Sequence, residues 1–287
     1  MPDKPKSMST LFLVATPIGN LEDLSLRALR ILKEVDLIAC EDTRHTSRLL
    51  SHYGIATPRE SHHEHNEITH TRRLLTLLEA GKSIALVSDA GTPLLSDPGY
   101  ALVSACLEAG FAVVPIPGPS AAIAALTASG LPTDCFFFAG FLPPRKAQRL
   151  KRLREIARVP ATLVVYEAPH RLLAALEDMI DVLGDRGACL ARELTKIHEE
   201  WLRGSLSEIL AILRSRALIR GEITLMVDRG TAESASPKPC FPESIARHLE
   251  EEMQQTHASR KDALKAIARQ RGISRRDAYR QLVGEKQ

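Results

Sequence analysis

The sequence lacks any close pair of cysteines. Its five cysteines are scattered, with no C-x-x-C motif and no histidine at zinc-ligand spacing, which argues against a zinc site or a disulfide framework. An odd, scattered set of thiols favours a reducing compartment. The apolar run Leu11 to Ala15, after a charged N-terminus, is too short for a signal sequence or a membrane span. We therefore expect a soluble, cytoplasmic protein with no membrane-spanning segment.

The sequence also lacks the glycine-rich signatures of several enzyme classes. No G-x-G-x-x-G follows the first apolar run, which argues against a nicotinamide or flavin Rossmann domain. A P-loop would need a glycine where Thr76 stands, and there is no G-x-S-x-G nucleophile elbow. The four histidines between residues 62 and 70 lie in a polar stretch without strict ligand spacing, so we expect no metal site.

Charge is present but unevenly distributed. The formal net charge is only +3 over 287 residues. Residues 144–158 and residues 259–281 nevertheless carry +6 each, which leaves −9 on the rest of the chain. Charged helix faces are usually just solvated, yet two basic segments on an acidic body suggest a polyanionic partner such as nucleic acid.

The apolar pattern predicts an α/β protein. A length of 287 residues suggests about two domains. Short apolar runs predict buried strands, and helical periodicity separates them, which is typical of a parallel sheet covered on both faces. In the first half these runs are 11–16, 36–40, 83–88 and 112–116. The expected helices between them are 25–35, 71–81 and 100–110.

The second half predicts another α/β domain and a small helical unit. Its apolar runs are 135–141, 161–167, 188–193 and 222–228, and the capping-box pattern Ser205-x-x-Glu208 predicts a helix start. Residues 230–242 are rich in Ser and Pro and indicate a linker. We expect domains at 10–118 and 119–230, a linker at 231–242 and a basic, all-helical unit at 243–287.

Four loops are candidates for binding a ligand, because ligands of parallel α/β sheets lie beyond the carboxyl ends of the strands. They are TPIGNLEDL (16–24), SDAGTPLLSDPG (88–99), PGPSAA (117–122) and YEAPHR (166–171). Each has an ordinary interpretation as a turn or a helix start, with Ser25 and Ser120 as caps. Two Gly/Pro/Asp loops on one sheet edge are better explained by a bound small molecule.

Read in order, VATPIGNLEDLS, CEDTRHT, SDAGTPLLSDPG, PIPGPSA, YEAPHR, ARELTK and GEITLMV resemble the tetrapyrrole methylase superfamily of S-adenosylmethionine-dependent methyltransferases. The resemblance covers about residues 10–230. Within the superfamily, the motifs most resemble the ribosomal RNA branch. It implies two α/β domains with the methyl donor S-adenosyl-L-methionine between them, usually in a homodimer. The implied reaction is methylation of the ribose 2′-hydroxyl of a cytidine in the decoding region of 16S rRNA, in the small ribosomal subunit.

Matching of motifs implies a set of donor-binding residues. They are Ile18, Gly19, Asp89, Gly91, Thr92, Ser120, Ala121, Glu167, Ala168 and Met226. A carboxylate, a histidine or a neutral lysine could take the hydroxyl proton. Among several candidates near the expected cleft we favour Glu167 or Lys196 as this base.

RNA contacts are expected from arginines and lysines. Arg44 and Arg171 are candidate phosphate contacts, as are members of the two basic segments: Arg145, Lys146, Arg149, Arg275 and Arg276. Two other functions stay open. One is methylation of a small tetrapyrrole, which would not need basic segments. The other is a non-catalytic RNA-binding ribosome-assembly factor, against which the intact loops argue.

Overall fold

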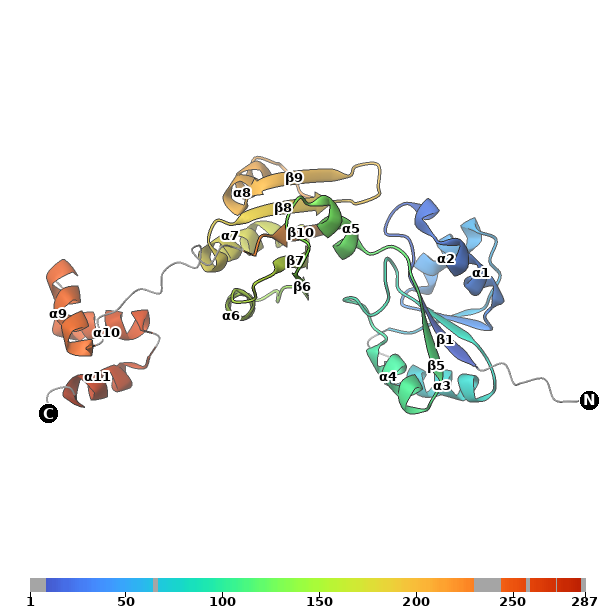
Figure 1. The fold of residues 1–287 in the computed structure, drawn as a ribbon, viewed down its shortest axis with the longest axis horizontal. Helices are drawn as coiled ribbons and strands as arrows, with labels where there is room; N and C mark the ends of the chain where they lie inside the picture. The colour runs from blue at the N-terminus through green and yellow to red at the C-terminus, as the bar shows by residue number, and fades with distance from the viewer. Residues whose placement is uncertain (1–8, 64–66, 230–243, 257–258, 272, 285–287) are drawn as a thin grey trace, which may run out of the picture. The chain divides into compact units, whose positions relative to one another are not determined.

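The first sheet of the computed structural model is parallel throughout (Figure 1). The structure describes residues 9–63, 67–229, 244–256, 259–271 and 273–284. In spatial order the strands are β3 (Arg59–Ser61), β2 (Leu37–Cys40), β4 (Ile84–Val87), β1 (Thr10–Val14) and β5 (Ala112–Ile116). The four strands expected in this half are confirmed. β3 was not expected, because it has only three residues and no apolar run.

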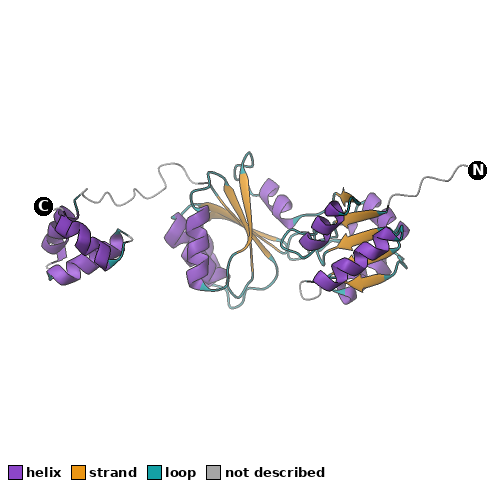
Figure 2. Ribbon diagram, turned by 90° about the horizontal axis from the view of Figure 1, so that it is seen from below, coloured by secondary structure: helices purple, strands orange, loops and turns teal. Residues whose placement is uncertain are grey.

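Helices cover both faces of this sheet (Figure 2). They are α1 (Leu26–Glu34), α2 (Thr43–His52), α3 (Glu67–Glu79) and α4 (Tyr100–Glu108). Successive side chains of a strand point to opposite faces. Val14 of β1 therefore packs with α1 and α2, whereas Leu11 packs with α3 and α4. The continuous apolar strands of the sequence are explained by this two-sided burial.

The second sheet is mixed. In spatial order it contains β6 (Phe136–Phe141), β7 (Thr162–Glu167), β10 (Ile223–Val227), β8 (Gly187–Arg192) and β9 (Glu200–Ser205). β6 and β7 are parallel, while β10 is antiparallel to both of its neighbours and β9 is antiparallel to β8. The four strands predicted from apolar runs are present. The sequence did not predict β9, which carries Glu200 and Arg203 among its six residues.

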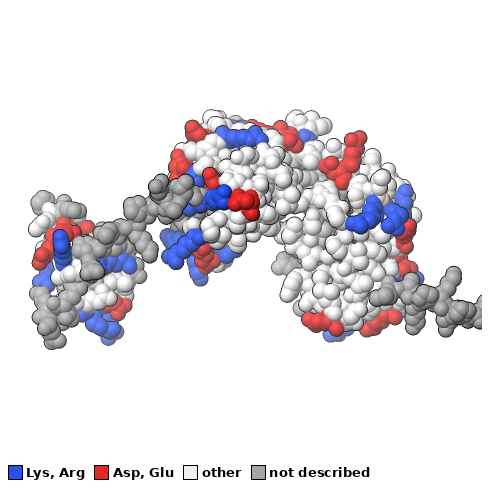
Figure 3. All heavy atoms as spheres, in the orientation of Figure 1, with Lys and Arg blue, Asp and Glu red and all other residues white. Residues whose placement is uncertain are grey.

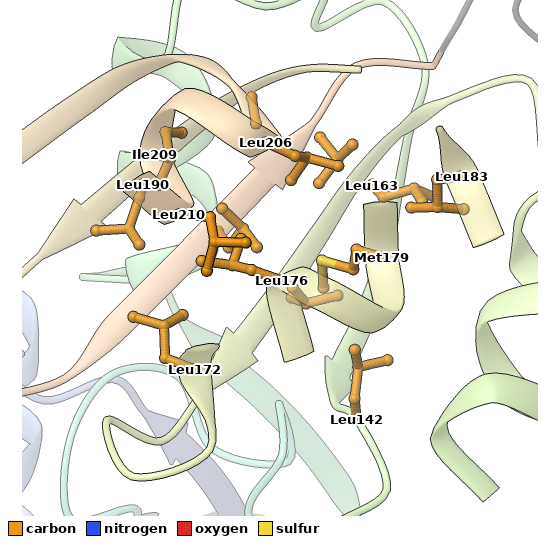
Figure 4. Close-up of a cluster of buried hydrophobic side chains, with 14 of the residues drawn as sticks. Leu142, Leu163, Leu172, Leu176, Met179, Leu183, Leu190, Leu206, Ile209 and Leu210 are labelled. Carbon is orange, nitrogen blue, oxygen red and sulfur yellow. The ribbon is translucent and has the colours of Figure 1, made fainter. Parts of the chain in front are cut away.

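One face of the second sheet packs against three helices. These are α6 (Lys146–Ile156), α7 (Leu172–Leu183) and α8 (Leu206–Arg214), and Figure 4 shows the leucine-rich cluster between them and the sheet. α8 begins with the predicted capping box, since Ser205 Oγ accepts from Glu208 N and Glu208 Oε2 accepts from Ser205 N. The other face packs against α5 (Ala121–Ala128).

β10 contributes to both of these cores. Ile223, Leu225 and Val227 point into the cluster with α7 and α8, whereas Met226 points to the face that packs with α5. Ile18, from the loop after β1, belongs to that same second cluster. The loop that follows β1 of the first sheet is thus anchored on the second sheet.

The C-terminal helices form a core of their own. α9 (Ile245–Thr256), α10 (Arg260–Gln270) and α11 (Arg275–Gly284) bury a cluster that includes Ile245, Ile267 and Leu282. The chain divides into two compact units at residues 231 and 232. The expected linker at 231–242 lies outside the described residues, and the boundary expected at 118 stays a prediction. Among the helices that the structure describes, none combines the length and apolar character needed to cross a bilayer.

Candidate functional site

The loops after β1 and β4 are joined by their backbones. Thr16 N donates to Gly91 O at 2.8 Å, and Gly91 N donates to Thr16 O at 3.0 Å. Gly91 has φ +86°, a conformation that favours glycine, and a Cβ there would lie 3.3 Å from Ile18 Cγ2. Two of the four candidate loops therefore form one rigid edge, and the glycine permits their close approach.

All four candidate loops meet around one cavity of about 360 Å³, here called the first cavity. Eight of the ten expected donor-binding residues line it: Ile18, Asp89, Gly91, Thr92, Ser120, Ala121, Glu167 and Ala168. The segment Gly221–Thr224 at the start of β10 closes it from the second sheet. Loops that are far apart in the sequence are thus gathered at one place.

The lining of the first cavity is apolar with acidic groups. Leu95, Phe141 and Ile223 supply apolar surface, and four carboxylate side chains reach the cavity: Asp89, Asp97, Glu167 and Glu222. Among the described residues that line it, none is lysine, arginine or histidine. Such a lining suits a ligand that combines apolar groups with positive charge.

Asp97 has an unusual proton affinity. Burial, reinforced by the negative charges of Glu41 and Asp89, raises the pKa of Asp97 to about 6, although a hydrogen bond from Ser88 acts in the opposite direction. A bound cation would offset this repulsion. A cationic ligand in the first cavity would therefore favour the ionised form of Asp97.

Glu167 is held in place at the end of β7. Its Oε1 accepts from Ala168 N at 2.8 Å and from Arg171 Nη2 at 2.7 Å. The residue is only 2% exposed, and its Oε2 is buried without a hydrogen-bond partner. Buried carboxylate oxygens are normally paired, so this oxygen is available to a donor group of a bound ligand. Arg171, expected to contact phosphate, instead positions this carboxylate.

Ser120 begins α5 without capping it. Its side chain accepts no hydrogen bond from the first turn, whereas Ala122 N donates to the Tyr166 hydroxyl at 3.2 Å. Burial raises the pKa of Tyr166, so the phenol stays neutral. Ser120 and Tyr166 both line the first cavity. The ordinary interpretation of Ser120 as a side-chain cap is therefore wrong.

A second cavity of about 400 Å³ adjoins the first. Ile18, Asp89, Ala90 and Glu222 line both cavities. Gly19, expected beside the donor, lines only the second. His45 and Arg48 of α2 also line it, together with Lys196. The sequence did not single out His45 and Arg48, although both lie at or just after the CEDTRHT motif and, three residues apart, share one face of a helix.

The loop between β8 and β9 rests on the turn after β1. Glu193 and Thr195 in this loop have positive φ, at +54° and +65°. Asn20 N donates to Thr195 Oγ1 at 3.0 Å. A Cβ at residue 19 would lie 2.5 Å from Lys196 Cγ, so only glycine fits beneath this loop. The role of Gly19 is therefore to admit the β8–β9 loop.

Lys196 does not suit the role of a neutral base. Its Nζ lies 2.8 Å from Glu193 Oε1 and 3.0 Å from Glu222 Oε2. Partial burial opposes these contacts, yet together the hydrogen bonds and the charges of Glu193 and Glu222 raise the pKa of Lys196. The ammonium group therefore stays protonated, which argues against the expected proton transfer and favours a role as a fixed positive charge.

Two other expectations do not match the structure. Arg149 is buried, donates through Nε to Asp178 Oδ2 at 2.8 Å and through Nη1 to Pro144 O at 3.1 Å. It cannot reach a phosphate while it is engaged inside the domain. Met226 is fully buried and does not line either cavity, but belongs to the same core cluster as Ile18. Arg149 therefore holds α6 to α7, and Met226 is part of the core between β10 and α5.

The remaining basic candidates are exposed. Arg44 lies on α2 and pairs with Asp42, and Arg145 immediately precedes α6. Lys146 is exposed even though its Nζ lies 3.3 Å from Asp178 Oδ1, and Arg275 and Arg276 begin α11. Figure 3 shows Lys and Arg side chains over α6 and over the C-terminal helices. In the described part of the chain, no group of three or more His, Cys, Asp or Glu could hold a metal ion.

The chain is similar to known methyltransferases. The family model of the tetrapyrrole (corrin/porphyrin) methylases matches residues 10–210. The ribosomal RNA small subunit methyltransferase I of Halalkalibacterium halodurans is 51% identical over 94% of this chain and 93% of its own. The protein of the same name from Bacillus subtilis is 43% identical, over 95% of this chain and 93% of its own.

Solved structures share the fold of the first unit. A diphthine synthase superimposes with a TM-score of 0.61 at 16% identity, covering 77% of this chain and 90% of its own. Uroporphyrin-III C-methyltransferase from Thermus thermophilus, complexed with S-adenosyl homocysteine, gives a TM-score of 0.54 at 21% identity and covers 77% and 98%. At these identities the likeness extends to the fold alone.

Proposed function

The chain belongs to the tetrapyrrole (corrin/porphyrin) methylases, in the branch of the ribosomal RNA small subunit methyltransferases I, and from this premise we propose that it methylates 16S rRNA of the small ribosomal subunit. The methyl donor is S-adenosyl-L-methionine. The acceptor is the 2′-hydroxyl of a cytidine in the decoding region. The observation that carries this proposal is the adjacency of an acidic, apolar cavity and a second cavity that contains basic groups.

The first cavity fits the donor. S-adenosyl-L-methionine combines an apolar adenosine with a positively charged sulfonium, and the first cavity combines apolar walls with carboxylates. The unpaired Oε2 of Glu167 can accept from a hydroxyl or amino group of the donor. Backbone around Gly91 and Thr92 and the start of α5 at Ser120 provide polar groups without bulk.

The protein's own contribution to the reaction is mainly orientation and electrostatics. The bound donor supplies an activated methyl group. Asp89 lines both cavities, and its Oδ1 accepts from Asp42 N at 3.0 Å, which fixes the carboxylate. We propose that Asp89, in place of Glu167, accepts the proton of the hydroxyl. Asp89 lies where the cavities meet and is not occupied by an ion pair as Glu222 is, whereas Glu167 lines only the first cavity and pairs with Arg171.

Exposed basic side chains would bind the RNA backbone. Arg145 and Lys146 at the start of α6 and Arg275 and Arg276 on α11 are accessible, and Arg44 adds a further group on α2. Neutralisation of phosphates by such groups gives affinity that does not depend on sequence. The two +6 segments of the sequence would thus bind RNA, with Arg149 and Arg171 holding carboxylates instead.

We also propose a homodimer. Tyr100 and Leu107 of α4 are 77% and 59% exposed, next to the apolar edge strand β5. Exposed apolar side chains grouped beside an open sheet edge are typical of an interface. Sedimentation equilibrium should give twice the chain mass for the wild type and the single mass for Leu107→Glu. A monomeric wild type at micromolar concentration would contradict the proposal.

The cytoplasm is the proposed compartment. Cys40, Cys106 and Cys189 are buried free thiols, and Cys135 is an exposed free thiol. Free thiols are typical of proteins in a reducing environment. An rRNA substrate would place the enzyme in the same compartment.

The experiment that tests the function is a labelled methyl-transfer assay with three acceptors. These are small ribosomal subunits from cells that lack the modification, naked 16S rRNA, and a precorrin. Nucleoside mass spectrometry of the product should find a label in 2′-O-methylcytidine. Label in the precorrin alone would support the tetrapyrrole alternative, and no label in any acceptor would support a non-catalytic RNA-binding factor.

A further inference from the structure

We infer that the second cavity is the acceptor site, where Arg48 and His45 of α2 bind the phosphate beside the ribose that is methylated. The inference rests on the proposed function, since it assigns the place of the RNA nucleotide within it. The first cavity would then hold the donor and the second the acceptor.

The two cavities differ in the charge that they offer. The first has carboxylates and no basic lining residue among those described, whereas the second contains His45, Arg48 and Lys196. Lys196 neutralises Glu222, which is one of the two acidic residues in the lining of the second cavity. A sulfonium compound fits the first lining and a phosphodiester fits the second.

Arg48 is available for a ligand. Its neighbour Arg44 is occupied by Asp42, with Nη2 to Oδ2 at 2.8 Å, and Arg59 donates to Thr43 O and to Ser47. No side chain in the described part of the protein pairs with the guanidinium of Arg48, which is exposed at the cavity. A planar guanidinium matches the two oxygens of a phosphate, and such charge-assisted pairs are among the stronger hydrogen bonds.

Because the two cavities adjoin, an acceptor bound in the second would contact a donor bound in the first. Ile18, Asp89, Ala90 and Glu222 line both spaces, so a ribose in the second cavity lies next to a ligand in the first. A volume of about 400 Å³ is of the size that holds a small molecule, which corresponds here to a single nucleotide rather than a duplex. The cytidine therefore enters unstacked from its neighbours, as bases do in other enzymes that modify them.

The β8–β9 loop forms the wall that completes the site. Thr195 binds the turn after β1, and Gly19 leaves room for Lys196 to lie across it. Lys196 lines the second cavity, and its Nζ is held between Glu193 and Glu222, so its charge is balanced within this wall. The acceptor phosphate meets Arg48 and His45 of α2, while Lys196 offsets the negative charge of Glu222 in the wall of the cavity.

Arg48→Gln and Arg48→Lys test the inference in the full-length protein, with Arg27→Gln on the exposed face of α1 as the matched control. Methyl transfer is measured against the concentration of small ribosomal subunits at several salt concentrations. Binding of S-adenosylhomocysteine is measured by titration calorimetry. For Arg48→Gln the KM for the subunits should rise about 10- to 100-fold, and the slope of log KM against log salt should fall by about 0.7 to 1.

Donor-analogue affinity should stay within about twofold of the wild type in every variant, and Arg48→Lys should recover part of the KM because it keeps the charge. Arg27→Gln should behave as the wild type. An unchanged KM and salt slope for Arg48→Gln would overturn the inference, as would an equal loss of analogue affinity. If the wild-type protein labels no RNA, the proposed function itself fails, and this result is distinct from an active wild type with a silent Arg48 variant.

Discussion

Replacing Arg149 with methionine should lower the thermal stability of the protein without weakening its electrostatic attraction to RNA. Arg149 stands in the middle of the basic segment 144–158, yet it is 4% exposed and its partner Asp178 is 1% exposed. The guanidinium contacts Asp178 Oδ2 through Nε at 2.8 Å and through Nη2 at 2.6 Å. Methionine has a similar length, so the change removes the charge and leaves the volume nearly filled.

The magnitude follows from what remains around Asp178. Loss of one member of a buried ion pair costs about 3–5 kcal/mol, because the other charge stays in the interior without compensation. Lys146 Nζ still lies 3.3 Å from Asp178 Oδ1, which places the expected loss near the lower end, at about 3 kcal/mol. For a unit of this size that corresponds to a fall in Tm of roughly 6–12 °C.

The assay is thermal unfolding of Arg149→Met, of the double variant Arg149→Met/Asp178→Leu, and of Lys151→Met, an exposed position on the same helix. The double variant should recover most of the loss, because it leaves no buried charge without a partner. Lys151→Met should keep the Tm. In binding to a 16S rRNA fragment, only Lys151→Met should lower the salt dependence of the affinity.

The reverse pattern would contradict an internal role of Arg149. A Tm of Arg149→Met within about 2 °C of the wild type, combined with a lower salt slope for RNA, would mean that the guanidinium contacts phosphate. It would also mean that the ion pair with Asp178 contributes little to stability.

Three further predictions concern the site and the tail. Gly19→Ala should lower the free energy of unfolding by about 1–3 kcal/mol in a urea titration, because its Cβ would force the β8–β9 loop from its place; full stability and full transfer activity would contradict this role. The affinity for S-adenosyl-L-methionine should rise as the pH increases through about 6, since the raised pKa of Asp97 means that its negative charge, favourable to the cationic donor, appears only in that range. Calorimetry of Asp97→Asn between pH 5 and 7.5 should show no such step, and a step that persists would assign the effect to another group. Deletion of residues 243–287 should weaken rRNA binding while donor affinity is unchanged, and the salt slope should fall by about 0.7 for each phosphate that the tail neutralises in the full-length protein. Equal RNA affinity of the shortened chain would contradict a role of the tail in RNA binding.

Much of the fold could be predicted from the sequence because burial on both faces leaves continuous apolar strands. β3 and β9 escaped prediction, since one is very short and the other has only two large apolar residues, Trp201 and Leu202, at the sheet edge. The four ligand loops were identified by their glycines, prolines and acidic residues, and they do surround one cavity.

The second cavity and the role of single side chains depended on contacts between distant residues. The partner of Arg149 lies in α7, so the run of basic residues around it looked uniform in the sequence. Lys196 stays charged because Glu222, far along the chain, lies beside it. His45 and Arg48 line the second cavity only because α2 packs next to the turn after β1. No local pattern contains this information.

The central position of β10 constrains the order in which the protein can be completed during synthesis. All five strands of the first sheet precede residue 117, so that sheet can close while the rest of the chain is still being made. The second sheet must wait for Ile223–Val227, because β7 and β8 have no other strand between them and would expose open edges until then. The same strand brings Ile223 and Thr224 to the first cavity. An unfinished chain therefore lacks one wall of the donor site, and competence to bind the donor arises only once nearly the whole first unit has been translated.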